Sequence, residues 1–306
     1  MKYLLTVKLY IINFILLPCI QGVRLGAIVD LFTICYRRPY ISLDEDIEVT
    51  YYLYNYKVMY ECNGFFFNQH KYVVNYYRRL LSGKDRNRKR KPNGALDCKH
   101  LNHHVPLYKI AECKYPDMLK SNPFSSVIYE NIWLGCDYNC FAARNFQILK
   151  QGYVTEINQY RRLHDTPPLI LDRYLEILAN EKAKRSCSRR RSSLIINLSI
   201  GYLLEIFSLE SADHLISKMY DRFLTNYNWH AKRHEGKYDK YAQMLWSGTK
   251  KVGVGVFLRN DKICVALLFS PRGCTRNFRM NVRPIGSKHI HMFAVFGKKY
   301  EMRREK

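Results

Sequence analysis

This 306-residue chain contains ten cysteines and ten histidines, residue types that can bind a metal ion or take part in nucleophilic catalysis. Cys136 and Cys140 are close enough in sequence to share a metal ion, but no second cysteine pair has the spacing of a zinc finger. His100, His103 and His104 lie upstream without a matching pattern. The sequence therefore favours disulfide bonds over a structural zinc site.

No motif of a known enzyme class accompanies these residues. The chain has no Gly-x-Ser-x-Gly elbow, no His-Glu-x-x-His helix, no glycine-rich phosphate loop and no dinucleotide fingerprint. A cysteine with a histidine as its base stays open, because such a pair is adjacent in space and not in sequence. The sequence thus predicts no catalytic residue and no cofactor.

The charge of the chain is strongly positive, with 50 Lys and Arg against 26 Asp and Glu and a net charge of +24. This balance favours an acidic partner, which could be nucleic acid, an anionic membrane surface or an acidic glycan. Nucleic acid is the least favoured, because no RNP-like motif is present. The basic run at residues 84–91 predicts an exposed loop, with a processing site or an anionic-surface patch as alternatives.

The N-terminus indicates the compartment. Lys2 precedes an apolar run from Leu4 to Ile20, which ends near Gly22. This pattern predicts a signal peptide at residues 1–22 and a secreted, extracellular protein, with a buried N-terminal helix as the alternative. Nine cysteines would then remain, most of them paired. Asn197 begins the one glycosylation sequon and is a possible modification site.

Apolar residues spaced three or four apart predict helices in the second half of the chain. One helix should cover residues 146–160 and end before Pro167 and Pro168. Asp172 is the expected N-cap of a second helix at residues 175–183. Ser211 is the expected cap of a third helix at residues 212–224.

Two segments, residues 252–258 and 263–269, are apolar at almost every position. Strands that are apolar on both faces are normally covered on both sides. Residues 259–262 supply a turn between them, so we expect an antiparallel hairpin. The hairpin should form the middle layer of a sandwich with helices on both faces. Alternation between Ile47 and Met59 predicts one or two further strands.

The hairpin and its flanks carry a family resemblance. Gln-x-x-Trp, Lys-Lys-x-Gly-x-Gly and Ser-Pro-Arg-Gly resemble the signature of the CAP superfamily of cysteine-rich secretory, venom-antigen and plant pathogenesis-related proteins; the matching residues are Gln243, Trp246, Gly253, Gly255, Pro271 and Gly273. The resemblance implies an α/β fold, a three-layer α-β-α sandwich at residues 143–285. Asn158, Tyr160 and Arg161 match the opening helix of that family.

The rest of the chain is less defined. Residues 23–142 form an N-terminal region in which Val73–Leu80 echoes Glu156–Leu163, so a decayed partial CAP-like unit and chance similarity both stay open. Residues 286–306 form a basic tail.

CAP domains usually present two His and two Glu in a central cleft, a set that can hold a divalent metal. The positions that the resemblance assigns to this tetrad carry Tyr202, Arg222, Lys240 and Ser188. Arg222 and Lys240 make the cleft cationic, so the sequence predicts no metal. The two cations either hold an anion or point into solvent. His214, His230 and His234 are nearby alternatives as ligands.

The resemblance implies a secreted, non-catalytic protein that binds a partner surface or a lipid, sterol or anionic ligand, with a host-interaction or immune role. The alternatives are a metal-dependent enzyme of CAP type and a basic protein that binds nucleic acid or heparin.

Overall fold

The computed structural model describes part of the chain, namely residues 28–29, 47–83, 91–97, 101–102, 104–113, 122–188, 198–231 and 233–290. The predicted signal peptide, Asn197, the tail beyond residue 290 and nearly all of the basic run at 84–91 lie outside the described residues. The chain divides into two compact units, residues 1–126 with 287–306 and residues 127–286. Each unit is described by itself.

The first unit contains a six-stranded antiparallel sheet in the order β1-β6-β2-β3-β4-β5. Its strands are β1 (Ile28–Val29), β2 (Val49–Tyr54), β3 (Lys57–Cys62), β4 (Phe65–Phe67), β5 (Ala95–Leu96) and β6 (Leu107–Cys113). Helix α3 (His70–Leu81) buries one apolar face and contacts β3 and β4. The strands predicted between Ile47 and Met59 are therefore present as β2 and β3. The short α9 (Ser287–Ile290) also belongs to this unit.

The second unit is built on a four-stranded sheet in the order β7-β9-β10-β8. Its strands are β7 (Ile170–Leu171), β8 (Gly201–Ser208), β9 (Lys251–Arg259) and β10 (Lys262–Ser270). Strands β9 and β10 pair antiparallel from Arg259 opposite Lys262 to Lys251 opposite Ser270. The predicted hairpin is confirmed, and β8 lies beside β10 at the edge of the sheet.

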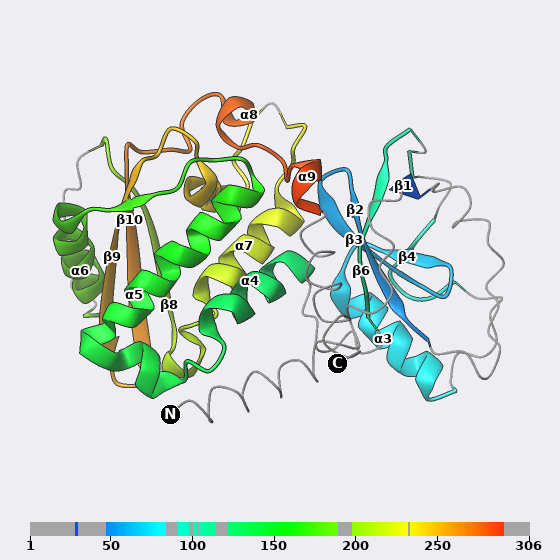
Figure 1. Ribbon diagram of the computed structural model, residues 1–306, viewed down its shortest axis with the longest axis horizontal. Coiled ribbons are helices and arrows are strands. Elements are labelled where there is room, and N and C mark those ends of the chain that lie inside the picture. The colour runs from blue at the N-terminus through cyan, green and yellow to red at the C-terminus, as the bar shows by residue number, and fades with distance from the viewer. Residues whose placement is uncertain are drawn as a thin grey trace, which may run out of the picture. The chain divides into compact units, whose positions relative to one another are not determined.

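Helices cover both faces of this sheet (Figure 1). On one face α6 (Arg173–Cys187) packs against β9 and β10, and its Leu175 and Ala179 meet Ala266 and Leu268. On the other face lie α5 (Tyr138–Leu163), α7 (Leu215–Asn226) and the 3-10 helix η3 (Asp239–Leu245). Helices on both faces of the sheet confirm the predicted three-layer sandwich. The physical reason is that strands apolar on both faces must be covered on both sides.

Two glycines of β9 set the distance between α6 and the sheet. A Cβ atom on Gly253 would lie 2.2 Å from the backbone carbon of Leu175, and one on Gly255 would lie 2.0 Å from that of Ala179. These separations are shorter than any van der Waals contact, so only glycine lets the helix backbone approach this closely. A disulfide between Cys187 and Cys264 also joins α6 to β10.

Helix boundaries follow the local signals with two differences. Asp172 caps α6 as predicted, because its side chain accepts a hydrogen bond from the Leu175 amide at 3.0 Å. Helix α5 includes a first stretch from Tyr138 that the sequence did not predict. After a non-helical break at residues 143–146 it continues to Leu163 as the helix predicted at residues 146–160. Ser211 does not cap α7; it ends a 3-10 turn, and α7 starts at Leu215 after residues 212–214 make a further turn.

The second unit begins at residue 127, inside α4 (Pro123–Trp133). It also contains two short elements, η2 (Leu209–Ser211) and α8 (Phe278–Asn281). Within the described residues, no helix combines the length and the hydropathy that crossing a bilayer requires.

Candidate functional site

The residues of the family motif form a buried polar junction rather than a reactive centre. Gln243 donates from Nε2 to the Thr249 hydroxyl at 3.0 Å and accepts from the Gly273 amide at 2.7 Å. Thr249 donates in turn to the carbonyl oxygen of Pro271 at 2.9 Å. Gln243 is buried, so these bonds fix η3 against the turn before β9 and the loop after β10. Trp246 is buried and packs over Gly273.

Arg161 completes this junction from α5. Its guanidinium is fully buried and donates four hydrogen bonds to main-chain oxygens, those of Pro167 at 2.6 Å, Met244 at 2.9 Å, Trp246 at 3.0 Å and Thr249 at 2.9 Å. Burial lowers the pKa of Arg161 to about 10, so it stays charged at neutral pH. The sequence matches Arg161 to the opening helix of the CAP superfamily but does not indicate this structural role.

The two cations predicted for the cleft lie around one carboxylate. Lys240 Nζ is 3.0 Å from Glu205 Oε1, and the Tyr241 hydroxyl donates to the same oxygen at 2.8 Å. Arg222 lies at the Tyr241 hydroxyl. Burial and Glu205 together raise the pKa of Tyr241. The two cations that the resemblance assigns to the cleft therefore already have an anion beside them, Glu205, which the sequence did not indicate.

The other two predicted cleft positions lie elsewhere. Tyr202 pairs with Leu268, which faces α6, so its side chain points to the opposite face of the sheet from Glu205. It is more than half exposed, with Lys182 of α6 over its ring. Ser188 ends α6 on that same opposite side, where its hydroxyl donates to the Lys184 carbonyl. Neither residue joins Lys240, because side chains along a strand alternate between faces.

A second polar cluster contains a buried carboxyl group. Glu156 of α5 is fully buried and accepts hydrogen bonds from Trp133 Nε1 at 2.8 Å and from the Tyr160 hydroxyl at 3.0 Å. Burial raises the pKa of Glu156 to about 8, and the charges of Asp221 and Asp213 act in the same direction, against the two hydrogen bonds. The group is therefore largely protonated at neutral pH, when Tyr160 can turn to accept its proton.

This raised pKa gives a testable pH dependence. Between the ordinary value of 4.5 and about 8, the folded state binds a proton that the unfolded chain has lost, so stability falls as pH rises. Glu156→Gln cannot ionise and should gain on the order of 2 to 4 kcal/mol over the native protein above pH about 8, and almost nothing below pH about 5. Denaturant titrations at both pH values check this; a constant difference would contradict it.

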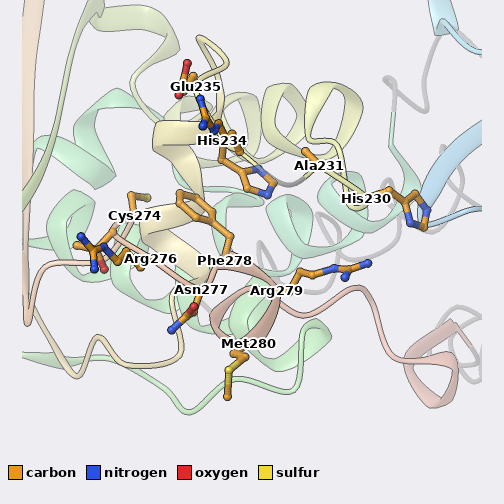
Figure 2. Close-up of a pocket in the computed structure, with 12 residues that line it drawn as sticks. His230, Ala231, His234, Glu235, Cys274, Arg276, Asn277, Phe278, Arg279 and Met280 are labelled. Carbon is orange, nitrogen blue, oxygen red and sulfur yellow. The ribbon is translucent and has the colours of Figure 1, made fainter.

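A pocket of about 1040 Å³ opens between the loop after α7 and the loop after β10 (Figure 2). Its lining residues are His230, Ala231, Arg233, His234, Glu235, Cys274, Thr275, Arg276, Asn277, Phe278, Arg279 and Met280. No sequence signal indicated this pocket, because the two loops lack periodicity and are separated by the whole hairpin. Of the histidines predicted as alternative ligands, His230 and His234 lie here, while His214 stacks on Tyr129.

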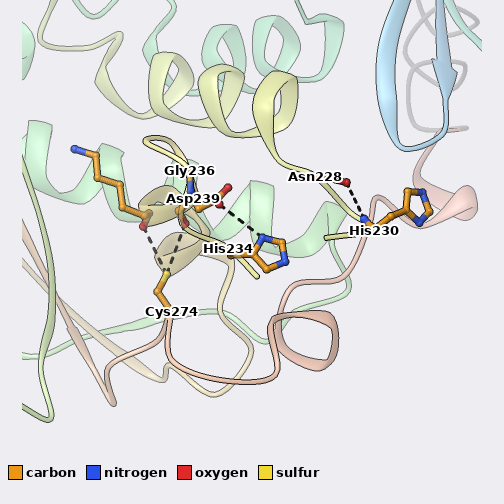
Figure 3. Close-up of polar contacts among 7 residues, drawn as sticks. Asn228, His230, His234, Gly236, Asp239 and Cys274 are labelled. Carbon is orange, nitrogen blue, oxygen red and sulfur yellow. Dashed lines mark hydrogen bonds and ion pairs between the residues drawn. The ribbon is translucent and has the colours of Figure 1, made fainter. Parts of the chain in front are cut away.

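The pocket has no activated nucleophile. Cys274 is a free thiol that contacts the main-chain oxygens of Asp239 and Lys240, at 3.8 and 3.7 Å (Figure 3). Burial, with the charge of Asp239, raises the pKa of Cys274 to about 12, so the thiol stays protonated. His234 Nδ1 points to Asp239 at 3.8 Å and makes no hydrogen bond to the thiol.

The cysteines that the structure describes confirm the expectation of disulfides. Cys136 and Cys140 are bonded to each other, so they are not a zinc pair. In the part of the chain that the structure covers, no group of three or more His, Cys, Asp or Glu side chains is placed to hold a metal ion. Cys62, buried in the first unit, is also a free thiol among the described residues.

Comparison with known proteins finds similarity within the second unit. The model of the cysteine-rich secretory protein family, CAP, matches residues 154–265, from α5 into β10. Human Golgi-associated plant pathogenesis-related protein 1 is 29% identical over 134 residues, which are 42% of this chain and 87% of the human protein.

Solved structures give weaker overall similarity. Venom allergen-like protein 4 of Schistosoma mansoni is 21% identical with a TM-score of 0.32, over 45% of this chain and 89% of that one. Na-ASP-1 is 15% identical with a TM-score of 0.37, over 44% of this chain and 41% of that one. The chain thus spans less than half of Na-ASP-1.

Proposed function

Because residues 154–265 form a domain of the cysteine-rich secretory protein family, CAP, we propose that this chain is an extracellular binding protein rather than an enzyme. Its CAP domain recognises an acidic partner through surface cations and performs no metal chemistry. The lipid or sterol ligand that the family resemblance implies stays a prediction.

One observation carries this proposal: the contact of Lys240 with Glu205 in the cleft, at 3.0 Å. In a metal-binding cleft the lone pairs of imidazole and carboxylate groups converge on the ion. Here Glu205 is engaged by Lys240 and Tyr241, and Arg222 adds a second positive charge. A divalent ion would have to displace Lys240 and then face two cations, without ligands to replace its lost water.

Zinc titration tests the proposal. The native chain should bind no stoichiometric zinc in isothermal titration calorimetry. The double variant Arg222→Glu with Lys240→His presents two carboxylates and one imidazole with Glu205, so we expect it to bind zinc at least about tenfold more tightly than the native chain. Stoichiometric zinc binding by the native chain at micromolar or lower concentrations would overturn the proposed role.

Two disulfides support an oxidising compartment for the mature protein. Expressed with its own N-terminus in a secreting cell, the chain should appear in the medium without residues 1–22. Intact-mass measurement checks the cleavage, and recovery of the uncleaved, fully reduced chain from the cytosol would contradict it.

A further inference from the structure

The pocket between the loops after α7 and β10 carries an excess of positive charge that the protein does not neutralise. Arg233, Arg276 and Arg279 line it, all of them exposed, and none makes an ion pair or hydrogen bond with another described residue. Glu235 is the one carboxylate among the lining residues. Unlike the cleft at Lys240, this pocket has no internal carboxylate that pairs with its cations.

The cations stand on two sides of the pocket. Figure 2 shows Arg279 extending toward His230 on one side and Arg276 beside Cys274 on the other, with Phe278 and His234 between them. Two separated cationic groups match a ligand that carries two anionic groups, and each guanidinium can hold an oxyanion through paired N–H donors.

The centre of the pocket is a rigid aromatic stack. The His234 ring lies between Tyr227, with centroids 4.6 Å apart, and Phe278, at 4.3 Å. Its side chain is only 3% exposed, and Nδ1 has no hydrogen-bond partner although Asp239 is 3.8 Å away. Burial lowers the pKa of His234, against the charge of Asp239. Because Nδ1 is buried and points to Asp239, it is not a contact for a ligand, and the stack serves the pocket as a fixed aromatic wall.

The lining also limits the kind of ligand. Among the twelve lining residues only Ala231, Phe278 and Met280 are apolar, apart from Cys274, so most of the lining side chains can donate or accept hydrogen bonds. The volume of about 1040 Å³ is large enough for more than one sugar ring.

We propose that this pocket binds a sulfated sugar unit of an acidic glycan, with sulfate groups at Arg276 and at Arg279 and a sugar ring over Phe278. This rests on the proposed binding role and names its ligand class. It uses residues separate from Lys240, Arg222 and Glu205, so the zinc titration and the experiment below can fail independently.

The test is calorimetric titration of the full mature chain with a sulfated heparin tetrasaccharide. Arg276→Gln with Arg279→Gln should weaken binding at least about tenfold, since it removes two charge-assisted contacts. The control, Arg173→Gln with Lys184→Gln, removes the same charge from exposed positions on α6 and should retain the native affinity. All substituted side chains are exposed, so folding is preserved and is verified by tryptophan fluorescence.

Two further probes separate the sources of binding. The desulfated tetrasaccharide should not bind, and phosphatidylglycerol vesicles should bind both double variants equally. Equal losses of tetrasaccharide affinity in both variants would mean that bulk charge binds the glycan, and the proposal would fail. Vesicle binding lost only in the Arg276 and Arg279 variant would assign the pocket to a lipid headgroup and would overturn it as well.

Discussion

Arg161→Met should lower the free energy of unfolding of the second unit by about 4 kcal/mol. An apolar side chain of similar length leaves four buried main-chain oxygens without their donor, namely those of Pro167, Met244, Trp246 and Thr249. Arg161→Lys should recover only part of this loss, since an ammonium group cannot present the planar fork that reaches oxygens in several directions.

Denaturant unfolding followed by tryptophan fluorescence reports on the second unit, in which Arg161 lies. All three tryptophans of the chain, Trp133, Trp229 and Trp246, lie within residues 127–286. Arg162→Met is the matched control, because Arg162 is the exposed neighbour on the same helix, and its loss should be within about 0.5 kcal/mol. If the two variants were equally stable, the junction would not depend on the guanidinium.

Gly255→Ala should destabilise the same unit by about 3 kcal/mol or more, although it adds a single methyl group. The new Cβ would lie 2.0 Å from the backbone carbon and 2.1 Å from the backbone oxygen of Ala179, so relief requires α6 to move off the sheet. Overpacking of a close-packed core costs about 1 to 3 kcal/mol where side chains can yield, and here the obstacle is backbone.

Gly248→Ala is the control for that substitution. Its added Cβ would find its nearest atom, Oδ1 of Asn281, at 3.5 Å, which is ordinary contact. The control should unfold within about 1 kcal/mol of the native protein. A Gly255→Ala variant as stable as this control would show that the approach of α6 to β9 is not limiting.

The predicted cleft positions and the pocket differ in whether the protein offsets their positive charge. At the predicted cleft positions Lys240 is paired with Glu205, so a carboxylate of the protein offsets its charge. In the pocket, Arg276 and Arg279 have no such partner in the described residues. The family resemblance predicted a site at Lys240 and Arg222, whereas the cations without a carboxylate partner in the described residues lie in the pocket, at Arg276 and Arg279.

The sequence by itself determined the central layer of the second unit. Residues 252–258 and 263–269 are apolar on both faces, and such strands are stable only between two layers of helices. Asp172 predicted the start of α6, because a short acidic side chain before an apolar stripe can accept hydrogen bonds from the free amides of the first turn. These features are local, and their physical cause can be found within a few residues.

Only the tertiary structure decided the chemistry of the candidate sites. Side chains alternate across β8, so it is Glu205 and not Tyr202 that faces Lys240, and motif alignment did not resolve that register. The main-chain oxygens that accept hydrogen bonds from Arg161 come from two separate segments, at Pro167 and at residues 244–249. The pocket comes from two loops on either side of the hairpin. Loops carry no periodic pattern, and which of their side chains meet is fixed by the packing of the helices and strands that they connect.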